Sequence, residues 1–125
     1  MGALRRPLSP ETVDSLTLVP VSQLHDLAWW IATEAAQYAG LSTDPDVSAS
    51  IAERALTANA HRRAQTSQLS NGEHRWLWLT LHRATNPDPV AAVDGALDAA
   101  RYAAGPHAVE LLDAARQRIA ALGSH

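Results

Sequence analysis

The sequence predicts an all-α protein, a bundle of four to five antiparallel helices behind a Pro-rich, mostly extended N-terminal arm. Alanine, the residue with the highest helix propensity, supplies 25 of the 125 residues. Apolar residues recur with helical spacing in several segments, and most prolines and glycines fall between those segments. A chain of this length builds a single core. We therefore expect an arm over residues 1–21 and one helical bundle domain over residues 22–125.

The arm holds three of the seven prolines, which favour extended chain. One short helical turn is expected at residues 9–12, because a serine that can cap it precedes a proline suited to the first helical position. The first long helix is expected from Ser22 to about Ala39. Its apolar residues follow the spacing of one helix face, and Gly40 ends it.

A second helix is expected to begin at Asp44-Pro45 and to end near Ser70. Its apolar face is interrupted by four polar residues, namely Arg54, His61, Arg62 and Gln65. Buried charge is costly unless it is paired. The distal half of this helix is therefore either a solvated end that extends beyond the core or one wall of a polar pocket beneath the following helix.

The third helix is expected to begin at residues 70–73, where Ser70 and Glu73 have the spacing of a capping box. It contains Trp76 and Trp78 and is apolar on nearly every side, so it should be the central buried helix. Residues 76–81 also have the composition of a buried strand, which could pair with residues 16–19. We favour the helix because an isolated pair of strands is only marginally stable.

The last two helices are delimited by proline and glycine. Asp88-Pro89 begins the fourth helix in the same way as Asp44-Pro45, and Gly105-Pro106 ends it and begins the fifth. The connections are short, which predicts that successive helices are antiparallel.

Composition and motifs exclude several kinds of function. The absence of cysteine excludes disulfides and thiolate chemistry. A net charge of -3 provides no excess of positive charge that would attract nucleic acid or an anionic membrane. His107 and Glu110 have the spacing of metal ligands but no second copy, so no metal site and no cofactor are expected. No signal peptide and no apolar run of about 20 residues is present, so we expect a cytoplasmic protein.

The remaining candidates form a surface for a ligand or a partner. The first helix carries a second stripe around His25 and Trp29, with small residues that allow close approach. Together with the polar residues of the second helix and the tryptophans of the third, the predicted surface contains His25, Trp29, Arg54, His61, Arg62, Gln65, Trp76 and Trp78.

These observations predict a non-enzymatic interaction protein, an accessory, regulatory or immunity-type subunit. A Trp-bearing helix followed by Ala-rich helices resembles small bacterial immunity-type helical proteins, in composition alone. We expect a homodimer joined through the first helix with Trp29 near its centre, or another protein partner. The alternative is a bundle with a pocket lined by tryptophan and histidine that binds, or acts on, a small apolar or aromatic molecule.

Overall fold

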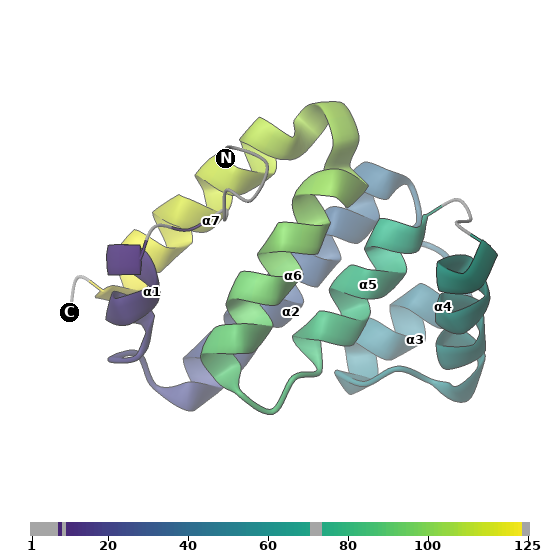
Figure 1. Ribbon diagram of the computed structural model, residues 1–125, viewed down its shortest axis with the longest axis horizontal. Coiled ribbons are helices and arrows are strands. Elements are labelled where there is room, and N and C mark those ends of the chain that lie inside the picture. The colour runs from purple at the N-terminus through teal and green to yellow at the C-terminus, as the bar shows by residue number, and fades with distance from the viewer. Residues whose placement is uncertain (1–7, 9, 71–73, 124–125) are drawn as a thin grey trace.

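A computed structural model confirms the all-α class (Figure 1). It describes residue 8, residues 10–70 and residues 74–123, and no strand occurs in that part of the chain. Its elements in chain order are α1 (Pro10–Leu16), α2 (Val21–Ala39), α3 (Pro45–Glu53), α4 (Ala58–Ser70), α5 (Arg75–Ala84), α6 (Pro89–Ala104), the 3-10 turn η2 (Gly105–His107) and α7 (Ala108–Gly123).

The centre of the fold is formed by α2, α5 and α6, which pack against one another. In Figure 1, α7 and α1 lie on one side of this centre, and α3 and α4 lie on the other. Alanine makes the close packing of α2 and α6 feasible, because the facing side chains are small. The alanines that are fully shielded from solvent on these two helices are Ala28, Ala32, Ala35, Ala92, Ala96, Ala99 and Ala100.

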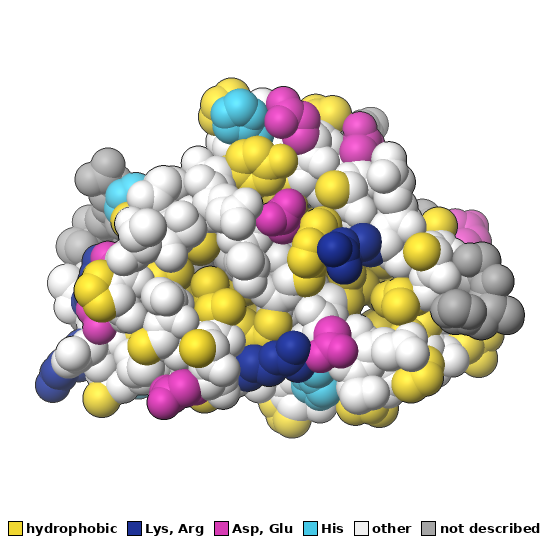
Figure 2. Space-filling model, turned by 180° about the vertical axis from the view of Figure 1, so that it is seen from behind, with side chains coloured by type: hydrophobic (Ala, Val, Ile, Leu, Met, Phe, Trp, Pro, Cys, Tyr) yellow, Lys and Arg dark blue, Asp and Glu magenta, His cyan; other side chains and the backbone are white. Residues whose placement is uncertain are grey.

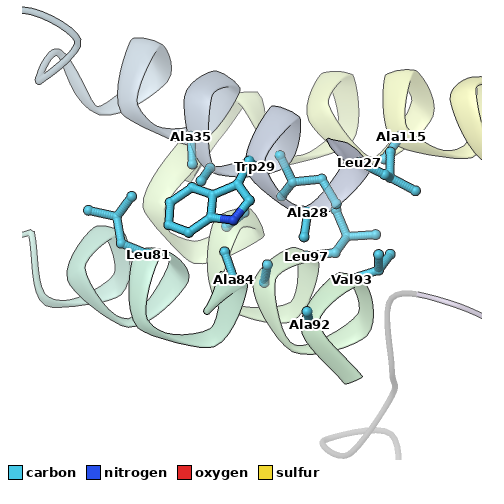
Figure 3. Close-up of a cluster of buried hydrophobic side chains, with 14 of the residues drawn as sticks. Leu27, Ala28, Trp29, Ala35, Leu81, Ala84, Ala92, Val93, Leu97 and Ala115 are labelled. Carbon is cyan, nitrogen blue, oxygen red and sulfur yellow. The ribbon is translucent and has the colours of Figure 1, made fainter. Parts of the chain in front are cut away.

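Trp29 lies inside this centre, with 4% of its surface exposed. Figure 3 shows its indole ring between α2 and the side chains of Leu81 and Ala84 on α5. The second stripe of the first helix therefore faces another helix of the same chain. A surface role for Trp29, and an interface centred on it, are wrong for this physical reason. The homodimer itself stays a prediction.

Residues 76–81 are helical, as expected, and lie within α5. The alternative strand pairing is wrong, because Leu16 ends α1 and the next residues form a turn. The predicted start of this helix at residues 70–73 is wrong, because α5 begins at Arg75, after His74 in a left-handed conformation with no side-chain cap. Ser70 is the last residue of α4, and residues 71–73 lie outside the described residues.

The segment predicted as one helix from residue 44 to residue 70 is two helices. It breaks at Arg54, which adopts a left-handed conformation with φ of 55° and ends α3. The Ser50 hydroxyl then accepts a hydrogen bond from the Thr57 backbone N–H at 3.3 Å, and the Thr57 hydroxyl accepts one from the Ala60 N–H at 3.2 Å. The second bond caps the start of α4.

The N-terminal arm is more helical than expected. α1 extends from Pro10 to Leu16 and packs against α6 and α7. Leu8, Leu16 and Val19 are buried, because their apolar side chains complete the core at that end of the bundle.

The remaining boundaries agree with the sequence. Gly40, with φ of 78°, ends α2, a conformation that glycine adopts without a steric penalty. Asp44 and Asp88 each precede a proline, and each accepts hydrogen bonds from two backbone N–H groups of the helix that follows. Among the described residues, no helix combines the length and the apolar character needed to cross a membrane.

Candidate ligand-binding cavity

A cavity of about 550 Å³ lies between α4 and α5. This volume falls within the range of small-molecule sites in proteins. Its lining is Leu56, His61, Ala64, Gln65, Trp78, Leu79 and His82.

Helical spacing explains how these side chains converge. His61, Ala64 and Gln65 are three and four residues apart on α4, so they share one face of that helix. Trp78 and His82 are four apart on α5 in the same way. The other face of α5 presents Leu77, Leu81 and Ala84 to the core. Thus α5 has one apolar face that stabilises the fold and a second that forms the cavity wall.

The polar groups of the lining are two imidazoles and one amide. His61 Nε2 and Gln65 Nε2 lie 3.2 Å apart, one turn apart on α4. No carboxylate is among the lining residues.

Arg63 contacts Trp78, the tryptophan of the cavity wall. Its guanidinium carbon lies 4.6 Å from the centre of the Trp78 ring, and Trp78 is only 3% exposed. The same guanidinium donates to both Asp44 oxygens, at 2.8 and 3.0 Å, and to Asp46 at 2.9 Å. Arg63 therefore connects the start of α3 to α4 and to the tryptophan of α5.

The ion pair also changes the acidity of its members. The hydrogen bond from Arg63 lowers the pKa of Asp44 from its usual value of 3.8, against the opposing effect of burial, and the backbone N–H groups of Val47 and Asp46 lower it further. The hydrogen bonds to Asp44 and Asp46 raise the pKa of Arg63. Both shifts show that the pair stabilises the charged forms.

Of the predicted surface residues, the structure brings His61, Gln65 and Trp78 together in the cavity. Leu56, Ala64, Leu79 and His82 complete it and were not predicted. One of them, His82, could have been found from the sequence, because it lies one turn after Trp78 on the same helix.

The other predicted residues lie elsewhere. Arg54 pairs with Asp26 at 2.5 Å, and Arg62 donates to Asn59 on its own helix. Trp76 packs against Tyr102 of α6, with ring centres 4.6 Å apart. His25 is half-buried on α2, and Trp29 is in the core. Of the four polar side chains that interrupt the predicted second helix, His61 and Gln65 therefore share the cavity, whereas Arg54 and Arg62 contact other neighbours.

A second cavity of about 300 Å³ lies between α2 and α7, and Asp26 and Arg118 are among its lining residues. Both are already engaged, Asp26 by Arg54 and Arg118 by the ring of Trp30 at 4.3 Å. Figure 2 shows the rear face of the molecule, where hydrophobic side chains occupy shallow furrows and charges of both signs are scattered between them. Among the described residues on that face, charges of one sign do not gather into a patch.

The described residues contain no group of three or more histidine, aspartate or glutamate side chains placed to hold a metal ion. His107 lies 3.4 Å from Glu110 and stacks on Tyr38 with ring centres 5.2 Å apart. These contacts give His107 a structural role at the start of α7.

No protein-family model, curated protein or solved structure matches this chain. The fold and the site define an all-helical protein with a ligand-sized, mainly apolar cavity between two of its helices.

Proposed function

We propose that the protein binds a small, mainly apolar molecule in the cavity between α4 and α5. The observation that supports the proposal is the cavity itself, whose lining combines Leu56, Ala64, Leu79 and Trp78 with the exposed side chains of two histidines and a glutamine. Ligand sites combine apolar walls with a few polar groups in this way. The two imidazoles are the lining groups capable of nucleophilic or acid–base chemistry, and because no hydroxyl, thiol or carboxylate accompanies them in the lining we favour binding over catalysis.

The expected affinity is modest. A ligand of about 15–20 non-hydrogen atoms gains roughly 0.3 kcal/mol per atom, which gives a dissociation constant of about 0.1 mM. Tighter binding requires that the polar groups of the lining also contribute.

The proposal can be tested with the neutral fluorophore N-phenyl-1-naphthylamine, whose emission rises in apolar surroundings. We expect saturable binding by the wild-type protein and at least a tenfold loss in Ala64→Phe, because the new ring occupies the cavity. The matched control is Ala58→Phe, at an exposed position of the same helix. Gln65→Phe, at an exposed position of the cavity wall, replaces Ala64→Phe if that variant does not fold. Equal binding by wild type and the filled variant would contradict the proposal.

A second candidate function is association with a protein, as an accessory, regulatory or immunity-type subunit. It is favoured by two exposed apolar side chains three residues apart in the chain, Leu18 in the turn after α1 and Val21 at the first position of α2. Leu18 is 87% exposed and Val21 is 58% exposed. We propose a second copy of this chain as the partner at this surface.

The antiparallel order of successive helices and a cytoplasmic location also stay predictions.

A further inference from the structure

We infer that Leu18 of one copy of this chain enters the α4–α5 cavity of a second copy, so that self-association and the binding of a small molecule compete for one cavity. The inference rests on the proposed function, because it uses the same cavity, and it adds the way in which a ligand controls assembly. It follows from how Leu18 is presented, what lines the cavity, where both features lie in the fold and which charges accompany them.

The turn after α1 presents Leu18 to solvent in a fixed position. Leu16 and Val19, which flank it in the chain, are buried and anchor the turn in the core. The backbone N–H groups of Leu18 and Val19 donate to the carbonyl oxygens of Ser15 and Leu16, at 3.1 and 3.0 Å. Leu18 itself is nevertheless 87% exposed. Because the backbone of this turn is already ordered, association through Leu18 costs little further ordering of the chain.

The lining of the cavity suits an aliphatic side chain. Its aliphatic residues are Leu56, Ala64 and Leu79, whereas Trp78 is almost fully buried and has Arg63 against its ring. A leucine needs neither a free aromatic face nor a charged partner, and the volume of about 550 Å³ is sufficient for its side chain. The exposed histidines and glutamine of the lining add polar groups, as in protein interfaces that combine an apolar centre with a polar rim.

Leu18 and the cavity lie at opposite ends of the molecule. Figure 1 shows α1, which the turn with Leu18 follows, at one end of the long axis and α4 at the other end. The leucine therefore does not reach the cavity of its own chain. Two copies placed side by side in opposite directions can bring each Leu18 to the cavity of the other copy, and the contact is then made twice in a closed dimer.

The charges that accompany the two features are complementary. α1 carries Glu11 and Asp14, which are both exposed, and no basic residue. α4 carries Arg62 and Arg63 and no acidic residue. Arg63 is bound to two aspartates at the start of α3, a cluster with one net negative charge, whereas Arg62 is exposed and donates to the neutral side chain of Asn59. Arg62 is therefore the residue of α4 that can attract the acidic α1 of a second copy.

The first test measures the self-association of a filled cavity by sedimentation. Ala64→Phe occupies the cavity and leaves Leu18 unchanged, so we expect a dimer at least tenfold weaker than that of the wild type. Ala58→Phe, at an exposed position of the same helix, is the matched control and should associate as the wild type does. Gln65→Phe replaces Ala64→Phe if near-UV circular dichroism shows that the latter has lost its native packing. A filled variant that dimerises like the wild type would overturn the inference and leave the proposed function standing.

The second test mixes two variants that do not associate alone. Leu18→Asp keeps the cavity and lacks the leucine, whereas Ala64→Phe keeps the leucine and lacks the cavity. We expect each to sediment as a 13.4 kDa monomer, and their equimolar mixture to contain a 1:1 heterodimer, because the mixture restores one complete contact. An interface in which Leu18 of one copy meets Leu18 of the other would instead leave Ala64→Phe dimeric, and this result would overturn the inference.

The third test connects assembly to ligand binding and uses N-phenyl-1-naphthylamine as the probe. A saturating concentration of the probe should convert the wild-type dimer to the monomer. Leu18→Asp should bind the probe at least as tightly as the wild type, because no leucine of a second copy occupies its cavity. A dimer that persists although the probe is bound would overturn the inference. If the probe binds to neither protein and Ala64→Phe is still monomeric, the proposed function fails and the contact between copies is supported.

Discussion

Asp44 connects the local chemistry of a helix start with the packing of the cavity wall. Its carboxylate accepts from the backbone N–H groups of Asp46 at 3.0 Å and Val47 at 3.3 Å, and it also receives the Arg63 guanidinium. Asp88 caps α6 in the same manner, with bonds of 3.1 and 3.2 Å to Val90 and Ala91. The two caps therefore differ mainly in the arginine, which makes Asp88 a matched control for Asp44.

We expect Asp44→Asn to lower the free energy of unfolding by about 1–2 kcal/mol, because asparagine caps a helix well but cannot form the charged hydrogen bond to Arg63. Asp88→Asn should change it by less than about 0.5 kcal/mol. Urea unfolding at pH 7 measures both values. Equal losses in the two variants would show that the Arg63 contact contributes nothing to stability.

The same pair predicts a dependence on pH. Because the folded pKa of Asp44 lies below its usual value of 3.8, the unfolded chain takes up a proton first as the pH falls. The stabilisation by Asp44 is therefore complete well above pH 3.8 and disappears as the pH falls through the folded pKa. The stability difference between wild type and Asp44→Asn should be constant from pH 7 to about pH 5 and should shrink below pH 3.8. A difference that persists undiminished at pH 2 would rule this out.

At the scale of the elements, the break between α3 and α4 positions the cavity. If residues 45–70 formed one continuous helix, His61 and Gln65 would follow the direction of α3. The left-handed residue Arg54 and the bond from the Thr57 N–H to the Ser50 hydroxyl turn the chain instead. The resulting direction of α4 lets it pack on α5 and form one wall of the open cavity.

We expect Arg54→Gly to raise the free energy of unfolding by about 0.5–1 kcal/mol, since a left-handed conformation costs a non-glycine residue roughly 1–2 kcal/mol. Asp26→Asn is the control, because it removes the exposed Arg54–Asp26 ion pair and leaves the backbone unchanged. Thermal unfolding of the three proteins is the measurement. A lower melting temperature for Arg54→Gly than for Asp26→Asn would refute the idea that the backbone conformation is the dominant effect.

The elements that could be predicted from the sequence are those specified by local chemistry. Asp-Pro pairs began helices at Pro45 and Pro89, and Gly40 ended α2, because capping and glycine geometry depend on a few neighbouring residues. The break at Arg54 was missed because an arginine occupies the left-handed position usually held by glycine. Its partners, such as Asp26, are distant in the sequence.

The cavity was predictable only in part for the same reason. Polar residues on an otherwise apolar face indicated that His61 and Gln65 were unusual, and the tryptophans indicated Trp78. Leucine is common in any protein core, so Leu56 and Leu79 gave no signal in the sequence. Only the way in which α4 packs on α5 places them in the lining. Trp29 was misplaced because helix periodicity defines a face of α2 without showing that α5 covers it.

At the scale of the whole molecule, the apolar side chains that the fold leaves exposed to solvent bear on whether the protein self-associates. We expect the wild-type protein to sediment as a dimer at micromolar concentration, through the surface that contains Leu18 and Val21, because large apolar side chains exposed together are typical of interfaces. Leu18→Asp should shift the protein to a 13.4 kDa monomer. Val109→Asp, at an exposed apolar position on α7, is the control and should sediment as the wild type does. A monomeric wild-type protein would contradict the prediction of a dimer.

The alanine-lined contact between α2 and α6 makes the two walls of the cavity differ in how far they can move. Small facing side chains leave the two backbones no room to shift, and α5 packs on both helices, so the wall that carries Trp78 is fixed. The opposite wall, α4, is a polar helix that packs on α5 and α3 and is tied to the start of α3 by Arg63. For a ligand in this cavity, we therefore expect α4 to adjust to its size while α5 stays in place.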